Sequence, residues 1–273
     1  MSDFIYPLIL GVSLLFFFWF LLKPKKAKEV HYLVQKDKSQ ILDISKAYDL
    51  YDNPKNVVIA HFSDTHFGKK IKPRKIKPII QSTIQQQPDI ILFSGDLLED
   101  YSKWPHRQSS DLIDKLNRLS APMGKFAVLG DRDYQANGQY FVKEILKSSQ
   151  FDLLVNQDLY QTKENISLHL TGLDDTLAGQ PVFNHPKKLS TWSILLMHET
   201  DYLGEIKNLT DYDLILTGHE FKKPLLKKIN AVPLFTNGLY QFNQKTLLSI
   251  YPGFSKWPHF IKKPVIYYYY LAK

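Results

Sequence analysis

Short runs rich in apolar residues recur along the chain, and several of them end in an aspartate or a histidine. The clearest runs cover residues 57–60, 89–93, 126–129, 193–197 and 213–217. Apolar runs of this length, bounded by turn-forming residues, predict buried β-strands rather than amphipathic helices. Each of the polar residues that follow is therefore expected at the carboxyl end of a strand.

Segments with helical spacing lie between the first of these strands. Residues 76–86 stop just before Pro88, where a helix is expected to end. Residues 110–119 carry one apolar face, and residues 140–147 form a shorter candidate helix. This alternation predicts an α/β domain with largely parallel pairing in its first half. Four consecutive tyrosines at 267–270 are typical of a strand that closes a sheet edge.

The amino terminus has a different character. Residues 4–22 contain no charged side chain and as a helix would extend about 28 Å, close to the hydrocarbon thickness of a bilayer. A transmembrane helix is favoured over a cleaved signal peptide, because no basic residue precedes the run and no small-residue cleavage site follows it. The next lysines are Lys23, Lys25, Lys26 and Lys28. Their positive-inside bias predicts a single-pass protein of the cell membrane with a cytoplasmic domain.

These features divide the 273 residues into three parts. We expect an anchor with its basic flank at 1–28, a linker with an entry strand at 29–55, and one large domain at 56–273. Apolar residues make up 44% of the chain, which is enough for one sizeable core. A formal net charge of +8 favours anionic partners. Cysteine is absent, which excludes disulfides, thiolate metal sites and a cysteine nucleophile.

Loops that leave the carboxyl ends of parallel strands converge on one edge of a sheet, so residues distant in sequence become neighbours there. The residues at such positions are Asp64, His66, Asp96, Asp131, His198 and His219. A single aspartate after a strand is usually a turn former, but five strand ends of this kind in one chain indicate a shared ligand. Aspartate and histidine suit Mn, Fe, Zn or a similar divalent ion. The sequence therefore predicts one or two divalent metal ions and no organic cofactor.

In order and spacing, the motifs resemble those of the calcineurin-like metallophosphoesterases. The family pattern D-x-H, G-D, G-N-H-[DE], a lone His and G-H-x-H corresponds here to residues 64–66, 95–96, 130–133, 198 and 218–221. With its predicted anchor, the chain is similar to the bacterial branch that includes UDP-2,3-diacylglucosamine pyrophosphatases. The resemblance implies a four-layer α/β/β/α sandwich of two mixed sheets, with a metal centre at one edge.

The resemblance also assigns roles. Asp64 and His66 are expected to hold a first metal, and Asp96 to bridge both metals. The second metal is expected to be completed by Asp131, His198 and His219. Such a centre hydrolyses a phosphodiester or pyrophosphate with a metal-activated water. The expected partners are a phosphorylated small molecule or a lipid-linked substrate, together with the membrane. Nucleic acid is not favoured, since the chain carries no recognisable binding motif.

Several positions depart from the family pattern. Arg132 and Asp133 are expected to be catalytic. The resemblance implies that Arg132 replaces a histidine that protonates the leaving group or stabilises the transition state. Arginine can do the second with its fixed donors, but it does not release its proton. An acidic leaving group, as in a pyrophosphate, suffers least from this change.

Phe221 replaces the last family histidine, which leaves the first metal with three protein ligands unless Glu220 reaches it. Asp131 replaces an asparagine, and Arg132 is expected to balance its charge. The alternative function is therefore a degenerate pseudoenzyme that binds a phosphorylated ligand or partner without turnover.

A basic run follows the Asp64–His66 motif. It consists of Lys69, Lys70, Lys72, Arg74, Lys75 and Lys77. The run is either a solvated entry to the next helix or a surface that attracts an anionic substrate or a phospholipid headgroup. Further along the chain, Asp174 and Asp175 follow an expected strand and indicate a turn.

Overall fold

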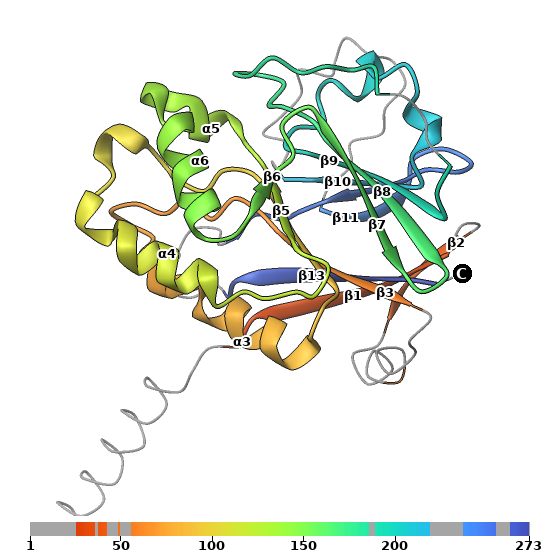
Figure 1. The fold of residues 1–273 in the computed structure, drawn as a ribbon, viewed down its shortest axis with the longest axis horizontal. Helices are drawn as coiled ribbons and strands as arrows, with labels where there is room; N and C mark the ends of the chain where they lie inside the picture. The colour runs from red at the N-terminus through yellow and green to blue at the C-terminus, as the bar shows by residue number, and fades with distance from the viewer. Residues whose placement is uncertain are drawn as a thin grey trace, which may run out of the picture.

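The computed structural model describes residues 26–35, 38–42, 49, 56–185, 189–218, 237–254 and 263–272. Two mixed β-sheets lie face to face, and α-helices cover the outer face of one of them (Figure 1). The predicted α/β class with two mixed sheets is confirmed.

The first sheet has seven strands in the order β2-β1-β13-β3-β4-β5-β6. Their bounds are β1 Lys28–Gln35, β2 Lys38–Leu42, β3 Val57–Phe62, β4 Ile90–Ser94, β5 Lys125–Val128, β6 Asp152–Leu153 and β13 Val265–Leu271. Strands β3 to β6 are parallel neighbours. Every residue of β3, β4 and β5 is buried, which explains why these strands appear in the sequence as continuous apolar runs.

The second sheet has six strands in the order β11-β12-β10-β9-β8-β7. Their bounds are β7 Gln157–Lys163, β8 Ile166–Gly172, β9 Trp192–Met197, β10 Leu214–Thr217, β11 Gly238–Gln241 and β12 Leu247–Ile250. The four inner strands β8, β9, β10 and β12 pair in parallel with one another, whereas the edge strands β7 and β11 pair antiparallel with β8 and β12. The exits of β9 and β10 thus point in the same direction.

The helices that the structure describes are short. They are α3 Lys77–Gln86, α4 Ser109–Asn117, α5 Asp131–Tyr134 and α6 Gln139–Ser148, with 3₁₀ turns η1 Pro73–Ile76, η2 Tyr101–Lys103, η3 His106–Gln108, η4 Gln135–Asn137, η5 Leu203–Glu205 and η6 Leu209–Asp211. Helix α3 ends as expected before Pro88, because Gln87 adopts a left-handed conformation. Helices α3, α4 and α6 lie on the face of the first sheet that points away from the second (Figure 1). Over the second sheet, the described part of the predicted fourth layer contains η5 and η6 rather than α-helices.

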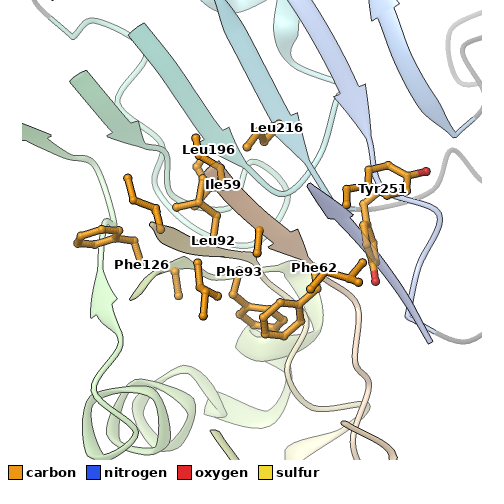
Figure 2. Close-up of a cluster of buried hydrophobic side chains, with 14 of the residues drawn as sticks. Ile59, Phe62, Leu92, Phe93, Phe126, Leu196, Leu216 and Tyr251 are labelled. Carbon is orange, nitrogen blue, oxygen red and sulfur yellow. The ribbon is translucent and has the colours of Figure 1, made fainter. Parts of the chain in front are cut away.

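Apolar side chains from both sheets fill the space between them. Ile59, Leu92 and Phe126 of the first sheet and Leu196 and Leu216 of the second are all buried in this cluster (Figure 2). A fully buried side chain of this size stabilises the fold by about 1.5–3 kcal/mol. The packed core therefore fixes where the strands of both sheets end, and with them the loops that follow.

Strand β13 is the clearest difference from the prediction for the first sheet. It lies between β1 and β3 in the sheet interior rather than at an edge. Its tyrosines are buried because their hydroxyl groups have partners: Tyr268 Oη lies 2.7 Å from Ser82 Oγ, and Tyr270 Oη lies 2.9 Å from His31 Nδ1. The predicted linker at 29–55 also contributes β1, which pairs with β13, and β2.

The predicted membrane localisation needs correction. The helix expected at residues 4–22 lies outside the described residues. Within the described ranges no helix is long and apolar enough to cross a bilayer. The described helices α3 and α6 have ten residues each, about half of the roughly 20 that a membrane span requires. The predicted cell-membrane localisation is therefore contradicted.

Candidate metal centre

The loops that follow β3, β4, β5 and β9 bring five of the six predicted ligands together. One potential ligand atom from each of Asp64, His66 and Asp96 lies within 4.8 Å of the others, and the same holds for Asp96, Asp131 and His198. Asp96 belongs to both groups. His219, the sixth predicted residue, lies outside the described residues.

Left-handed backbone conformations shape the first two loops. Asp64, His66 and Asp96 have φ angles of 53°, 45° and 60°. Such conformations cost non-glycine residues about 1–3 kcal/mol and persist where surrounding contacts impose them. Here the loops are held together by the Asp64 backbone N–H, which donates to the Gly95 carbonyl at 3.0 Å, and by the His66 N–H, which donates to the Asp96 carbonyl at 3.1 Å. The two loops therefore form one unit joined by backbone hydrogen bonds.

Asp133 fixes a third loop to this unit. Its carboxylate accepts the backbone N–H groups of Asp96 and Leu97 at 2.9 Å, of Leu98 at 3.3 Å and of Gly130 at 3.1 Å. The side chain is buried, and burial together with the nearby Asp96 carboxylate raises the pKa of Asp133 to about 7. A carboxylate so occupied has little capacity left for a substrate. The contacts favour a positioning role over the predicted catalytic one.

His198 is completely buried and oriented by the backbone of β4. Its Nδ1 lies 2.6 Å from the carbonyl oxygen of Ser94, which can only accept, so the proton sits on Nδ1. Nε2 lies 3.5 Å from Asp96 Oδ1 and 3.7 Å from Asp131 Oδ1. Burial alone lowers the pKa of His198, but the carboxylates around it outweigh burial and raise that pKa well above its usual value. The negative charge of these carboxylates, which favours a proton on His198, also favours a divalent cation between the side chains.

The residues present fit a divalent metal. Asp64 is buried, burial raises its pKa, and its Oδ2 has no hydrogen-bond partner in the part of the chain that the structure describes. Buried carboxylate oxygens normally have a partner. Gly130 leaves the space open, since a Cβ there would lie 2.4 Å from Asp96 Oδ1 and 2.7 Å from His198 Nε2. A carboxylate and imidazole donor set of this kind suits Mn, Fe or Zn.

Arg132 lies on the open side of the cluster. Its backbone N–H donates to Asp96 Oδ1 at 2.9 Å, while its partly exposed guanidinium has Nε 3.9 Å from Asp131 Oδ2. The expected charge balance between Asp131 and Arg132 thus takes the form of a long ion pair. Arg132 and His66 line the same cavity. The guanidinium is therefore available to an anionic ligand that approaches the cluster.

Some contacts near the centre were not found from the sequence. Glu99 Oε2 lies 3.5 Å from His66 Nδ1, although no motif singles it out. Asp175 and Glu199 are both fully buried, and burial followed by a hydrogen bond to Glu199 raises the pKa of Asp175 to about 9. Asp174 and Asp175 do form the expected turn, and their carboxylates accept the backbone N–H groups of residues 177, 178 and 180. In the sequence, only the position of Glu199 directly after His198 indicates that Glu199 lies near the centre.

A pair of mixed sheets with clustered aspartate and histidine side chains at the strand exits defines a candidate metal-dependent phosphoesterase. Residues 57–231 match the family model for the calcineurin-like phosphoesterase, and the chain belongs to this family. The predicted resemblance is confirmed.

Three relatives illustrate the similarity. The uncharacterized metallophosphoesterase YkuE of Bacillus subtilis is 30% identical over 67% of this chain and 67% of its own length. The phosphodiesterase YaeI of Escherichia coli is 29% identical over 62% of this chain and 62% of its own length. The UDP-2,3-diacylglucosamine pyrophosphatase LpxG of Chlamydia muridarum is 23% identical over 73% of this chain and 78% of its own length.

Proposed function

We propose that this protein hydrolyses a phosphodiester or a pyrophosphate with the help of divalent metal ions. The proposal rests on the observation that Asp96 belongs to both groups of potential ligand atoms. We assign Asp64, His66 and Asp96 to one ion. The other is assigned to Asp96, Asp131, His198 and His219. Divalent ions held by these residues would offset the charge of the phosphoryl group and would supply an activated water.

The chain's own residues have distinct tasks in this proposal. Asp133 holds the backbone of the Asp96 loop through four N–H groups. The Ser94 carbonyl orients His198 so that its Nε2 faces the carboxylates. Arg132 offers a planar set of donors to the equatorial oxygens of the phosphoryl group. Fixed donors of this kind act mainly by positioning and charge stabilisation.

Arg132 limits the kind of leaving group that the proposed reaction can release. Because a guanidinium stays protonated, it supplies no proton to a departing oxygen. Loss of general acid help typically costs about 10²–10⁴-fold in rate for a poor leaving group. Phosphate and phenolate oxygens leave without such help, so a pyrophosphate or an aryl phosphodiester is the favoured substrate type. Two relatives support these substrate types, since YaeI is named a phosphodiesterase and LpxG a pyrophosphatase. The acylated sugar nucleotide in the name of LpxG makes a lipid-linked pyrophosphate a candidate substrate.

Hydrolysis of bis(4-nitrophenyl) phosphate by the full-length protein with added manganese tests the proposal. We expect manganese-dependent turnover that Asp96→Ala abolishes. Asp114→Ala is the matched control, because Asp114 is an exposed aspartate of α4, and we expect it to retain full activity. Turnover that persists in Asp96→Ala would contradict the assigned role of Asp96.

The alternative is a pseudoenzyme that binds a phosphorylated ligand without hydrolysing it. It is favoured by Arg132 and Phe221, which stand where the family pattern has histidines. A double variant, Arg132→His with Phe221→His, separates the two functions. Turnover that appears only in the double variant would identify the native chain as the pseudoenzyme, whereas turnover of the native chain excludes it.

A further inference from the structure

A second feature of the site is a cavity of about 360 Å³ beside the metal cluster. The residues that line it include His66, Lys69, Lys70, Glu99, Lys103 and Arg132. His66 and Arg132 belong to the candidate centre, while Lys69 and Lys70 begin the basic run noted in the sequence. A ligand that fills this one cavity therefore contacts both the centre and the lysines. Its volume lies at the lower end of the range for small-molecule sites, about 300–1,000 Å³.

The charges of the cavity wall are unevenly distributed. Lys103 Nζ lies 2.6 Å from Asp100 Oδ2, so these two charges offset each other. The carboxylate of Glu99 lies 3.5 Å from the His66 ring, at the metal side. Lys69 and Lys70 are exposed and form no ion pair with the residues that the structure describes. The side of the cavity formed by these two lysines is thus positively charged, with no counter-ion among the described residues.

We propose that this cavity binds a second phosphate group of the substrate, next to the phosphoryl group that is cleaved. Lys69 and Lys70 contact the second phosphate, and Arg132 lies between it and the centre. This inference rests on the proposed function and narrows the substrate class to compounds with two adjacent phosphates, such as pyrophosphate diesters. A phosphodiester with a single phosphate leaves the lysine side of the cavity empty.

Two probes that differ by one phosphoryl group isolate this subsite. They are P1,P2-diphenyl methylenediphosphonate, a stable analogue of a pyrophosphate diester, and diphenyl phosphate. Binding of each to the full-length protein with manganese is measured by isothermal titration calorimetry. The test variant is Lys69→Ala with Lys70→Ala. The matched control is Arg74→Ala with Lys77→Ala, two exposed cations of the same basic run that do not line the cavity.

We expect the lysine variant to bind the diphosphonate about tenfold more weakly, because two partly solvated charge contacts are lost. Its affinity for diphenyl phosphate should stay within about twofold, and the control should leave both affinities unchanged. The difference between the probes should also shrink as salt is raised. Equal losses for both probes, or no loss for the diphosphonate, would overturn the inference.

These measurements are independent of turnover. Lysine-dependent binding of the diphosphonate by a protein that hydrolyses nothing would support the subsite and reject the proposed hydrolysis. Turnover of phosphodiesters with affinities indifferent to Lys69 and Lys70 would reject the subsite and leave the hydrolysis standing. All four substituted positions are exposed, so the variants should fold, which thermal melts verify.

Discussion

The carboxylate of Asp133 accepts the backbone N–H of Asp96 at 2.9 Å, which ties the loop after β5 to the loop after β4. The same carboxylate also holds Leu97, Leu98 and Gly130. Asp96 is the residue shared by both candidate ligand groups. The geometry of the centre therefore depends on Asp133, whose carboxylate binds backbone N–H groups of the loops.

Asp133→Asn should separate this positioning role from direct catalysis. An amide NH₂ replaces one accepting oxygen and leaves buried backbone N–H groups without a partner, which costs about 2–4 kcal/mol in unfolding free energy. Urea denaturation measures the loss, and manganese affinity should fall in parallel. Asp114→Asn is the control. A variant with unchanged stability and metal binding but no turnover would instead support the predicted catalytic role.

Gly130→Ala should damage the metal centre through volume alone. The new Cβ would lie 2.4 Å from Asp96 Oδ1 and 2.7 Å from His198 Nε2, so one of these side chains has to move. We expect manganese affinity to fall by at least about tenfold, together with about 1–3 kcal/mol of stability from overpacking. Gly204→Ala is the matched control, because a Cβ there meets no atom within 4 Å. Unchanged affinity in Gly130→Ala would argue against ligation by Asp96 and His198 together.

His61 should make stability depend on pH. It is fully buried, with Nε2 2.8 Å from Ser94 Oγ, and burial lowers its pKa from 6.5 to about 3. Between pH 3 and pH 6.5 the unfolded chain binds a proton at His61 that the folded chain excludes. The stabilising contribution of neutral His61 to the unfolding free energy is therefore complete above pH 6.5 and is lost as the pH falls toward 3.

His61→Gln removes this proton uptake. Between pH 6.5 and 5 the variant should lose about 2 kcal/mol less unfolding free energy than the native chain. Urea denaturation across this interval measures the difference. His106→Gln, which replaces an exposed histidine, is the control and should follow the native profile. Parallel profiles for His61→Gln and the native chain would show that His61 is not buried as a neutral ring.

The sequence predicted the part of the site that depends on strand exits. Asp64 and Asp96 follow the apolar runs of β3 and β4, and the parallel pairing of these strands gathers the residues after them. His198 follows β9 of the other sheet and reaches them because the two sheets pack face to face. The position of β13 was not predictable in this way, because four tyrosines suit an edge or an interior strand until the partners of their hydroxyl groups are known. Glu99 was missed for a related reason: its contact with His66 arises from the path of a loop, which follows no periodicity.

Asp133 illustrates a different limit. Its place in a motif suggested chemistry, but whether a carboxylate faces the substrate or the backbone depends on loop conformation. The left-handed conformations of Asp64 and Asp96, which shape those loops, leave no mark in a pattern of apolar and polar residues. Local backbone geometry, rather than residue type, decides the role of this side chain.

The shared metal centre is tested most directly by the number of divalent ions that each chain binds. Full-length protein is dialysed against manganese, and the bound metal is measured by inductively coupled plasma mass spectrometry, with Asp96→Ala and Asp114→Ala treated in parallel. We predict two ions, or one where only the tighter site fills, for the native chain and for Asp114→Ala, and none for Asp96→Ala. A native chain that binds no divalent ion, or an Asp96→Ala variant that binds as many as the native chain, would contradict the shared metal centre.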